Sequence, residues 1–321
     1  VPKRIPSGAW ASCDDRNSCD GGRPMTSDTD FQANPFVVLG VTTRDDRRKI
    51  VAMAEERSLH FDPELCQRAR SALTNPRARL LAELAWMPGV APRMAARLVA
   101  TLPQDPAAVR AQEGLPELAR ANLMAAAFAF VPEDGPSETI AEFMRDFALV
   151  VEFIDAEDVR RDINEDRAVA GFNEVGAIEH VEEGLVERRK AYRSALKSLL
   201  NRMTPDRLVE TMTRAVALAT DDGAQHGPQL IHDLTDAYEL EAQGFLHKER
   251  DNILVLVARA HGAAPSGEAA VAPLLDNLAT VARNWDRVAQ PIQINAKPRT
   301  NAAAYVIERP RARLTRASVL V

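Results

Sequence analysis

The sequence predicts an all-α protein, in which a short helical module precedes a larger helical bundle domain and both termini are disordered. Two observations predict this fold class. Aromatic residues make up only 5% of the 321 residues, whereas Ala, Leu, Arg and Glu are abundant, and Ala and straight-chain residues lose little conformational entropy in a helix. Apolar residues also recur at helical spacing along most of the chain. Hydrophobic residues amount to 46% of the sequence, so a core can be buried.

Composition divides the chain into four regions. Residues 1–33 are predicted to form a disordered leader, because residues 1–24 mix Pro, Gly, Ser and Asp without periodicity. Met25 follows directly, and we interpret it as a plausible start of natural translation. The other three regions are a helical module over 34–90, a larger helical domain over 91–289 and a basic, mobile tail over 290–321.

The helical module begins with the apolar stretch Pro35–Val41. A helix is predicted over residues 45–60, because apolar positions recur on one face of that segment. Those positions are Ile50, Met53, Ala54 and Phe61.

Two further helices of the module follow from their breaking and capping residues. Asp62 and Pro63 end the preceding helix and begin the second. The third begins at Asn75–Pro76, because Asn is a good N-cap and Pro suits the first helical position. It is expected to stop at Pro88–Gly89.

The larger domain is predicted to consist entirely of helices. The segment 116–131 is apolar nearly all round toward its end, so we expect that helix to be central and buried. The expected helices are 92–102, 116–131, 137–154, 157–170, 175–203, 204–220 (ended by Asp221–Gly223), 229–260 and 269–288.

Residues 35–86 resemble a J-domain, the module by which co-chaperones engage a DnaK-type ATPase. The resemblance covers about a sixth of the chain and is carried by three segments. They are Pro35–Val41, which resembles the opening segment of the family, Arg47–Ile50, which resembles the start of its basic second helix, and Ala72–Arg79, which resembles the junction between its third and fourth helices.

The motif that stimulates the ATPase in J-domains is altered here. Its His-Pro-Asp slot falls on Asp62, Pro63 and Glu64. An acid replaces the His, so the resemblance implies a J-like docking module without the usual stimulation. Arg47, Arg48 and Lys49 lie on the second helix, where a basic face could dock an acidic partner. A simple solvated face is the alternative, because Glu55 and Glu56 follow on the same helix.

No motif of an enzyme family is present. The six histidines include no pair at the i, i+4 spacing of metal ligands, and no glycine-rich phosphate loop occurs. His226 and His232 flank a helix start and are interpreted as solvated. Cys66 is interpreted as a core residue. The sequence therefore predicts no catalytic residue, cofactor or metal.

Charged residues between 179 and 190 are interpreted as one solvated helix face. Carboxylates precede cations at helical spacing, which favours pairs along the helix. The residues are Glu179, Glu182, Glu183 and Glu187, followed by Arg188, Arg189 and Lys190.

The tail contains the one basic segment. Residues 297–316 carry six Lys or Arg residues against Glu308, with Tyr305 as the single aromatic residue. A single aromatic residue offers little surface on which bases could stack. The net charge of −6 on the whole chain also does not attract nucleic acid. Nucleic acid is an improbable partner. No apolar run reaches the roughly 18 residues of a membrane span, and residues 1–24 contain no signal sequence. Few cysteines and these absences predict a cytoplasmic location without membrane contact.

The predicted function is that of a non-enzymatic, J-domain-like co-chaperone or adaptor, which mediates protein–protein interaction without the usual ATPase stimulation. The expected partner is a protein, and a DnaK-type chaperone is one candidate. Two alternatives remain open. The chain could be a helical scaffold that forms homo-oligomers through long helices such as 175–203, or an enzyme whose site is dispersed over distant helices.

Overall fold

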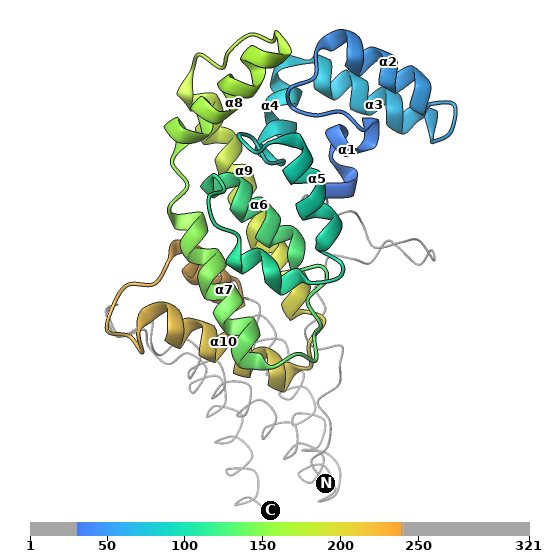
Figure 1. Ribbon diagram of the computed structural model, residues 1–321. Coiled ribbons are helices and arrows are strands. Elements are labelled where there is room, and N and C mark those ends of the chain that lie inside the picture. Colours follow the sequence, from blue (N-terminus) through green and yellow to red (C-terminus); the bar gives the residue numbers. More distant parts are fainter. Residues whose placement is uncertain (1–30, 239, 241–321) are drawn as a thin grey trace, which may run out of the picture. The chain divides into compact units, whose positions relative to one another are not determined.

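The computed structural model describes residues 31–238 and 240, and this part of the chain contains helices and no strand (Figure 1). The predicted all-α class is confirmed. None of the described helices is both long enough and apolar enough to cross a bilayer. The predicted helix over 269–288, the tail over 290–321 and residues 1–30 of the predicted leader lie outside the described residues.

The elements follow one another through short connections. They are η1 (Phe31–Ala33), α1 (Pro35–Leu39), α2 (Arg47–Arg57), α3 (Pro63–Thr74), α4 (Pro76–Leu84), α5 (Pro92–Thr101), η2 (Pro106–Ala111), α6 (Glu117–Ala127), α7 (Ser137–Glu152), α8 (Ala156–Ala170), α9 (Ile178–Leu200) and α10 (Pro205–Thr220), where η marks a 3-10 helix. Residues 229–238 are also helical.

The described residues form two compact units. The larger unit comprises residues 31–135 and 146–202, and the smaller unit comprises residues 136–145 together with the described residues from 203 onward. The first four α-helices pack on one another within the larger unit, and α9 packs on α4, α6 and α8. The proposed boundary between a module over 34–90 and a domain over 91–289 stays a prediction.

Side-chain caps fix the beginnings of the first helices. Asp46 caps α2 by accepting a hydrogen bond from the Lys49 N–H at 2.8 Å. Asn75 caps α4 by accepting from two N–H groups, at 3.1 and 3.0 Å, and Pro76 occupies the first turn as predicted. Each cap satisfies backbone donors that have no partner inside the helix. Gly40 ends α1 with φ +62°, a conformation that favours glycine.

The first predicted helix is shorter than its sequence pattern. It was expected over 45–60 with Phe61 on its buried face, but α2 ends at Arg57, and Phe61 is 59% exposed. The turn formed by residues 58–60 separates Phe61 from the helical periodicity, so its spacing from Ala54 no longer places it on the core side. The assignment of Phe61 to the buried face was therefore wrong.

The folded part begins before the predicted end of the leader at residue 33. Phe31–Ala33 form the 3-10 helix η1, and Phe31 is buried. Its ring meets the Trp86 ring edge-on, with 5.0 Å between centroids. Burying two aromatic rings together stabilises this short segment, which has no helical periodicity of its own.

Helix α6 forms the centre of the larger unit, as predicted. Leu123 and Met124 are completely buried. Just beyond its end, Phe128 contacts the ring of Phe147 edge-on at 5.2 Å, and Phe147 contacts Tyr192 of α9 at 5.4 Å. Edge-to-face contacts of this kind stabilise aromatic pairs beyond the area that they bury.

Gly184 allows α4 and α9 to approach closely. A β-carbon at this position would overlap the Cδ1 atom of Leu84, which is itself buried. Glycine lowers helix stability by about 0.5–1 kcal/mol relative to alanine, so its presence inside α9 is explained by this packing.

Gly184→Ala is expected to lower the free energy of unfolding by about 1–2 kcal/mol, because overpacking costs more than the gain in helix propensity. Urea denaturation monitored by circular dichroism measures the change. Gly176→Ala is the control, since a β-carbon there meets no atom within 4 Å. A variant Gly184→Ala that is more stable than the wild type would contradict the close approach.

Candidate functional site

The predicted basic face at the start of α2 is exposed to solvent. Arg47, Arg48 and Lys49 are all exposed. Lys49 donates to Asp45 Oδ1 at 2.8 Å. Burial raises the pKa of Asp45, but hydrogen bonds from Lys49 and Thr42 outweigh burial, and the net shift is downward. Arg47 and Arg48 form no ion pair with any described residue, so both charges are available to a partner.

Asp62, Pro63 and Glu64 lie at the turn between α2 and α3, and all three are exposed. Asp62 accepts a hydrogen bond from the Glu64 N–H at 2.9 Å and thereby caps α3, and Pro63 fills its first turn. Ordinary helix initiation therefore accounts for this tripeptide. The basic residues 47–49 lie at the opposite end of α2, roughly 16 Å away along the helix axis, so the structure does not bring the two predicted groups together.

The turn exposes apolar side chains that the sequence analysis missed. Leu59 is 77% exposed, Phe61 is 59% exposed and Leu65 is 39% exposed. The Arg57 guanidinium lies 5.3 Å from the centre of the Phe61 ring, in a cation–π contact. We call Leu59, Phe61 and Leu65 the hairpin tip. Exposed apolar side chains that gather on one part of a surface are typical of protein-binding sites.

A buried ionic cluster ties α4 to α8. Glu83 Oε1 accepts a hydrogen bond from Arg79 Nε at 2.7 Å, and Glu83 Oε2 accepts two from Arg167 at 2.7 and 2.9 Å. The side chains of all three residues are almost fully buried. Arg79 also donates to the Thr43 carbonyl oxygen at 2.9 Å. Burial lowers the pKa of Arg79, and the neighbouring Glu83 opposes that shift.

Aromatic rings and a second carboxylate complete the surroundings of this cluster. The Arg79 guanidinium lies 3.7 Å from the ring centre of Phe172 and 5.5 Å from that of Phe36. Asp166 accepts from Thr43 Oγ1 at 2.6 Å and from Arg44 Nε at 2.8 Å. The buried carboxylates are therefore engaged in contacts that hold helices together, which is a structural role.

Asn122 of α6 forms a second buried polar cluster. Its oxygen accepts from Tyr192 Oη at 2.8 Å and from Arg188 at 2.8–3.2 Å, and its amide donates to the carbonyl oxygens of Leu84 and Trp86. Burial raises the pKa of Tyr192. The prediction that Arg188 belongs to the solvated face was wrong, because Arg188 is buried against Asn122.

The carboxylates of α9 have fewer cationic neighbours than predicted. Glu187 pairs with Lys190 at 2.7 Å, and Glu183 contacts Arg77 of α4 at 3.9 Å. Glu179 and Glu182 are exposed and form no ion pair with a described residue. Arg188, one of the cations expected to pair with these carboxylates on the solvated face, is buried in the core instead.

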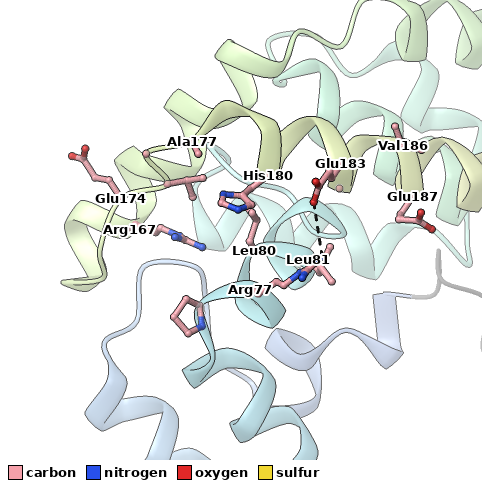
Figure 2. Close-up of a pocket in the computed structure, with 14 residues that line it drawn as sticks. Arg77, Leu80, Leu81, Arg167, Glu174, Ala177, His180, Glu183, Val186 and Glu187 are labelled. Atoms are coloured by element: carbon pink, nitrogen blue, oxygen red, sulfur yellow. Dashed lines mark ion pairs between the residues drawn. The ribbon is translucent and has the colours of Figure 1, made fainter.

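A groove of about 900 Å³ lies between α4 and α9 and extends to the loop before α9 (Figure 2). We call it the α4–α9 groove. Its apolar residues include Leu80, Leu81, Val175 and Val186, and its charged or titratable residues are Arg77, Arg167, Glu174, His180, Glu183 and Glu187. In Figure 2, Glu183 reaches from α9 toward Arg77 on α4.

Histidine and cysteine side chains form no metal site in the part of the chain that the structure describes: no group of three or more His, Cys, Asp or Glu is arranged to hold an ion. His226 is exposed and His232 is half-buried. Cys66 is buried in the core, as predicted.

The carboxylate of Asp162 has a perturbed acidity. Burial raises its pKa above the ordinary 3.8, Arg161 opposes the shift at 3.6 Å, and the charges of Glu165 and Asp158 add to it. A carboxyl whose pKa is raised in the folded state contributes stability that is fully present below its unfolded pKa and is lost as the pH rises through its folded pKa.

Asp162→Asn is therefore expected to be more stable than the wild type at about pH 7, with the difference vanishing toward about pH 3, where Asp162 is protonated in both states. Denaturant midpoints of both proteins across this range measure the difference. Glu56→Gln, which removes an exposed carboxylate of α2, is the control. A difference that does not depend on pH would contradict the assignment.

Comparison of the chain with protein-family models, with curated proteins and with solved structures finds no match. The fold and the surfaces described above therefore define the chain only as an all-α helical bundle protein. The resemblance to J-domains stays a prediction that rests on residues 35–86.

Proposed function

We propose that this protein is a non-enzymatic, J-domain-like adaptor that docks a protein partner through the hairpin of α2 and α3. The observation that carries the proposal is the hairpin tip, whose three exposed apolar side chains flank the position that the resemblance assigns to the His-Pro-Asp motif. An isolated exposed apolar residue is ordinary, but three within seven residues, at the turn and the start of α3, favour a binding surface.

The order of the first helices supports the J-like part of the proposal. A short α1 is followed by α2 and α3, which pack against each other, and α4 begins at the predicted Asn75–Pro76 junction. The unpaired charges of Arg47 and Arg48 provide a second contact at the far end of α2, suited to an acidic partner.

The proposal includes the loss of ATPase stimulation. A carboxylate stands where J-domains carry the His, and the backbone of α3 already uses the Asp62 side chain as its cap. A DnaK-type chaperone is thus a candidate for binding without stimulation, and the adaptor role does not depend on it.

The first test measures ATP turnover by a DnaK-type chaperone with the full chain and with Asp62→His. We expect no stimulation by the wild type, because the required His is absent. Stimulation by the wild-type chain would contradict the proposed loss of that activity.

The second test measures binding through the hairpin tip. Phe61→Ser combined with Leu59→Ser is expected to weaken capture of the same chaperone, or of another purified partner, at least about tenfold, which corresponds to about 1.4 kcal/mol. Val169→Ser is the matched control, since Val169 is 68% exposed and belongs to α8, outside the hairpin. Equal affinity of the double variant and the control would contradict docking through the tip.

A further inference from the structure

We propose that the α4–α9 groove binds a positively charged, amphipathic helical segment of a partner protein. This surface is distinct from the hairpin tip, so the inference goes beyond the adaptor role of the hairpin. Its success or failure can be measured independently of that role, because no residue of the tip lines the groove.

The apolar part of the groove suits a helix that presents one apolar face. Leu81 of α4 is 46% exposed and Val186 of α9 is 50% exposed, and both line the groove. Leu80 and Val175 form the more buried part of the wall. Helices that bind in grooves insert apolar side chains spaced three or four residues apart, and exposed apolar walls on two helices provide complementary contacts.

The charged residues in and near the groove determine whether the partner segment must be cationic or anionic. Of the two arginines in the groove, Arg167 is almost fully buried and is held at 2.7 Å by Glu83, the carboxylate that it shares with Arg79, and Arg77 lies 3.9 Å from Glu183. Glu174 at the edge of the groove is exposed and forms no ion pair with a described residue.

The same excess of negative charge continues along α9. Glu179 and Glu182 lie within two residues of the groove residue His180 on α9 without lining the groove themselves, and neither has a cationic partner among the described residues. Unpaired carboxylates around an apolar groove attract a cationic segment and repel an anionic one.

The charge also argues against a second copy of this chain as the occupant. In a symmetric dimer the same patch faces itself, so Glu174, Glu179 and Glu182 of two copies would approach one another. Like charges in close juxtaposition oppose association.

The test uses a fluorescent peptide of about 18 residues, long enough to form a helix on binding. Leucines are placed at helical spacing on one face, and lysines occupy the other positions. The full chain is titrated against this peptide by fluorescence anisotropy. One control peptide scrambles the same residues so that the leucines share no face, and a second replaces every lysine with glutamate.

We expect the amphipathic cationic peptide to bind with a dissociation constant in the micromolar range and each control peptide to bind at least about tenfold more weakly. Affinity should fall with added salt, because the carboxylates are exposed. Equal binding of the scrambled peptide would overturn the proposal, since it would show unspecific attraction between opposite charges. Absence of binding would overturn it as well.

Variants of the chain test whether the peptide binds in the α4–α9 groove. Leu81→Ser combined with Val186→Ser should weaken the peptide about tenfold or more without a change in charge, and Glu174→Gln combined with Glu182→Gln should weaken it several-fold. Val169→Ser, which changes an exposed apolar residue of α8 that does not line the groove, should leave the affinity unchanged.

Equal loss in Val169→Ser would overturn the assignment to the groove. Circular dichroism of each variant excludes loss of the fold as the cause. Two further outcomes would show that the groove is occupied by something other than a partner protein. Tighter peptide binding after removal of residues 290–321 would indicate competition by this chain's own basic segment. A dimer in light scattering that Leu81→Ser abolishes would indicate a second copy.

Discussion

Glu83→Ala is expected to lower the free energy of unfolding by about 3–5 kcal/mol, because it leaves two buried cations without their counter-ion. Glu83 is the carboxylate that both Arg79 and Arg167 share, at 2.7 Å each. Neither arginine can lose its charge, and neither is open to water. Urea denaturation monitored by circular dichroism measures the loss.

A triple variant separates the effect of unpaired charge from the effect of lost packing. Glu83→Leu combined with Arg79→Met and Arg167→Met removes all three charges together. Replacement of a complete buried ionic cluster by apolar residues is often neutral, so we expect the triple variant to be much more stable than Glu83→Ala. If both variants were equally unstable, packing and the contacts of Arg79 with Phe172 and Thr43 would dominate instead.

The second large effect is expected for Asn122→Ala, with a loss of about 2–4 kcal/mol. The substitution removes an acceptor of Tyr192 and Arg188 and the donor to the carbonyl oxygens of Leu84 and Trp86. These carbonyls lie at the end of α4 and two residues beyond it, where backbone acceptors lack helical partners.

Tyr192→Phe is the matched control for Asn122→Ala. It removes the hydrogen bond from the Tyr192 hydroxyl to Asn122 and leaves Asn122 bonded to Arg188, so a loss of about 1 kcal/mol is expected. Thermal denaturation of both variants measures the ratio. Equal losses would contradict the central position of Asn122 in the cluster.

Local chemistry was sufficient to predict helices but not their ends. Asn75–Pro76 marks the start of α4 because a cap and a proline act within one turn. The end of α2 at Arg57 carries no glycine or proline, and the apolar Phe61 extends the helical pattern beyond it. Periodicity alone therefore overestimated the helix and placed an exposed ring in the core.

The buried charges could not be predicted, because a buried glutamate has the same appearance in sequence as a solvated one. Glu83 and Arg167 are separated by 84 positions, and nothing local indicates their contact. Gly184 is the one available signal for the α4–α9 groove. A glycine inside a long helix lowers its stability and so indicates a close neighbour, although the sequence does not say which one.

The long separation between Glu83 and Arg167 has a consequence during synthesis on the ribosome. At about 5–20 residues per second, roughly 4–17 seconds pass between the emergence of the two residues. Throughout that interval α4 exists without the cation from α8 and without α9, the helix that carries Gly184. The nascent chain therefore exposes the inner face of its first four helices to the cell, and any factor that shields apolar surface can bind there before α9 arrives.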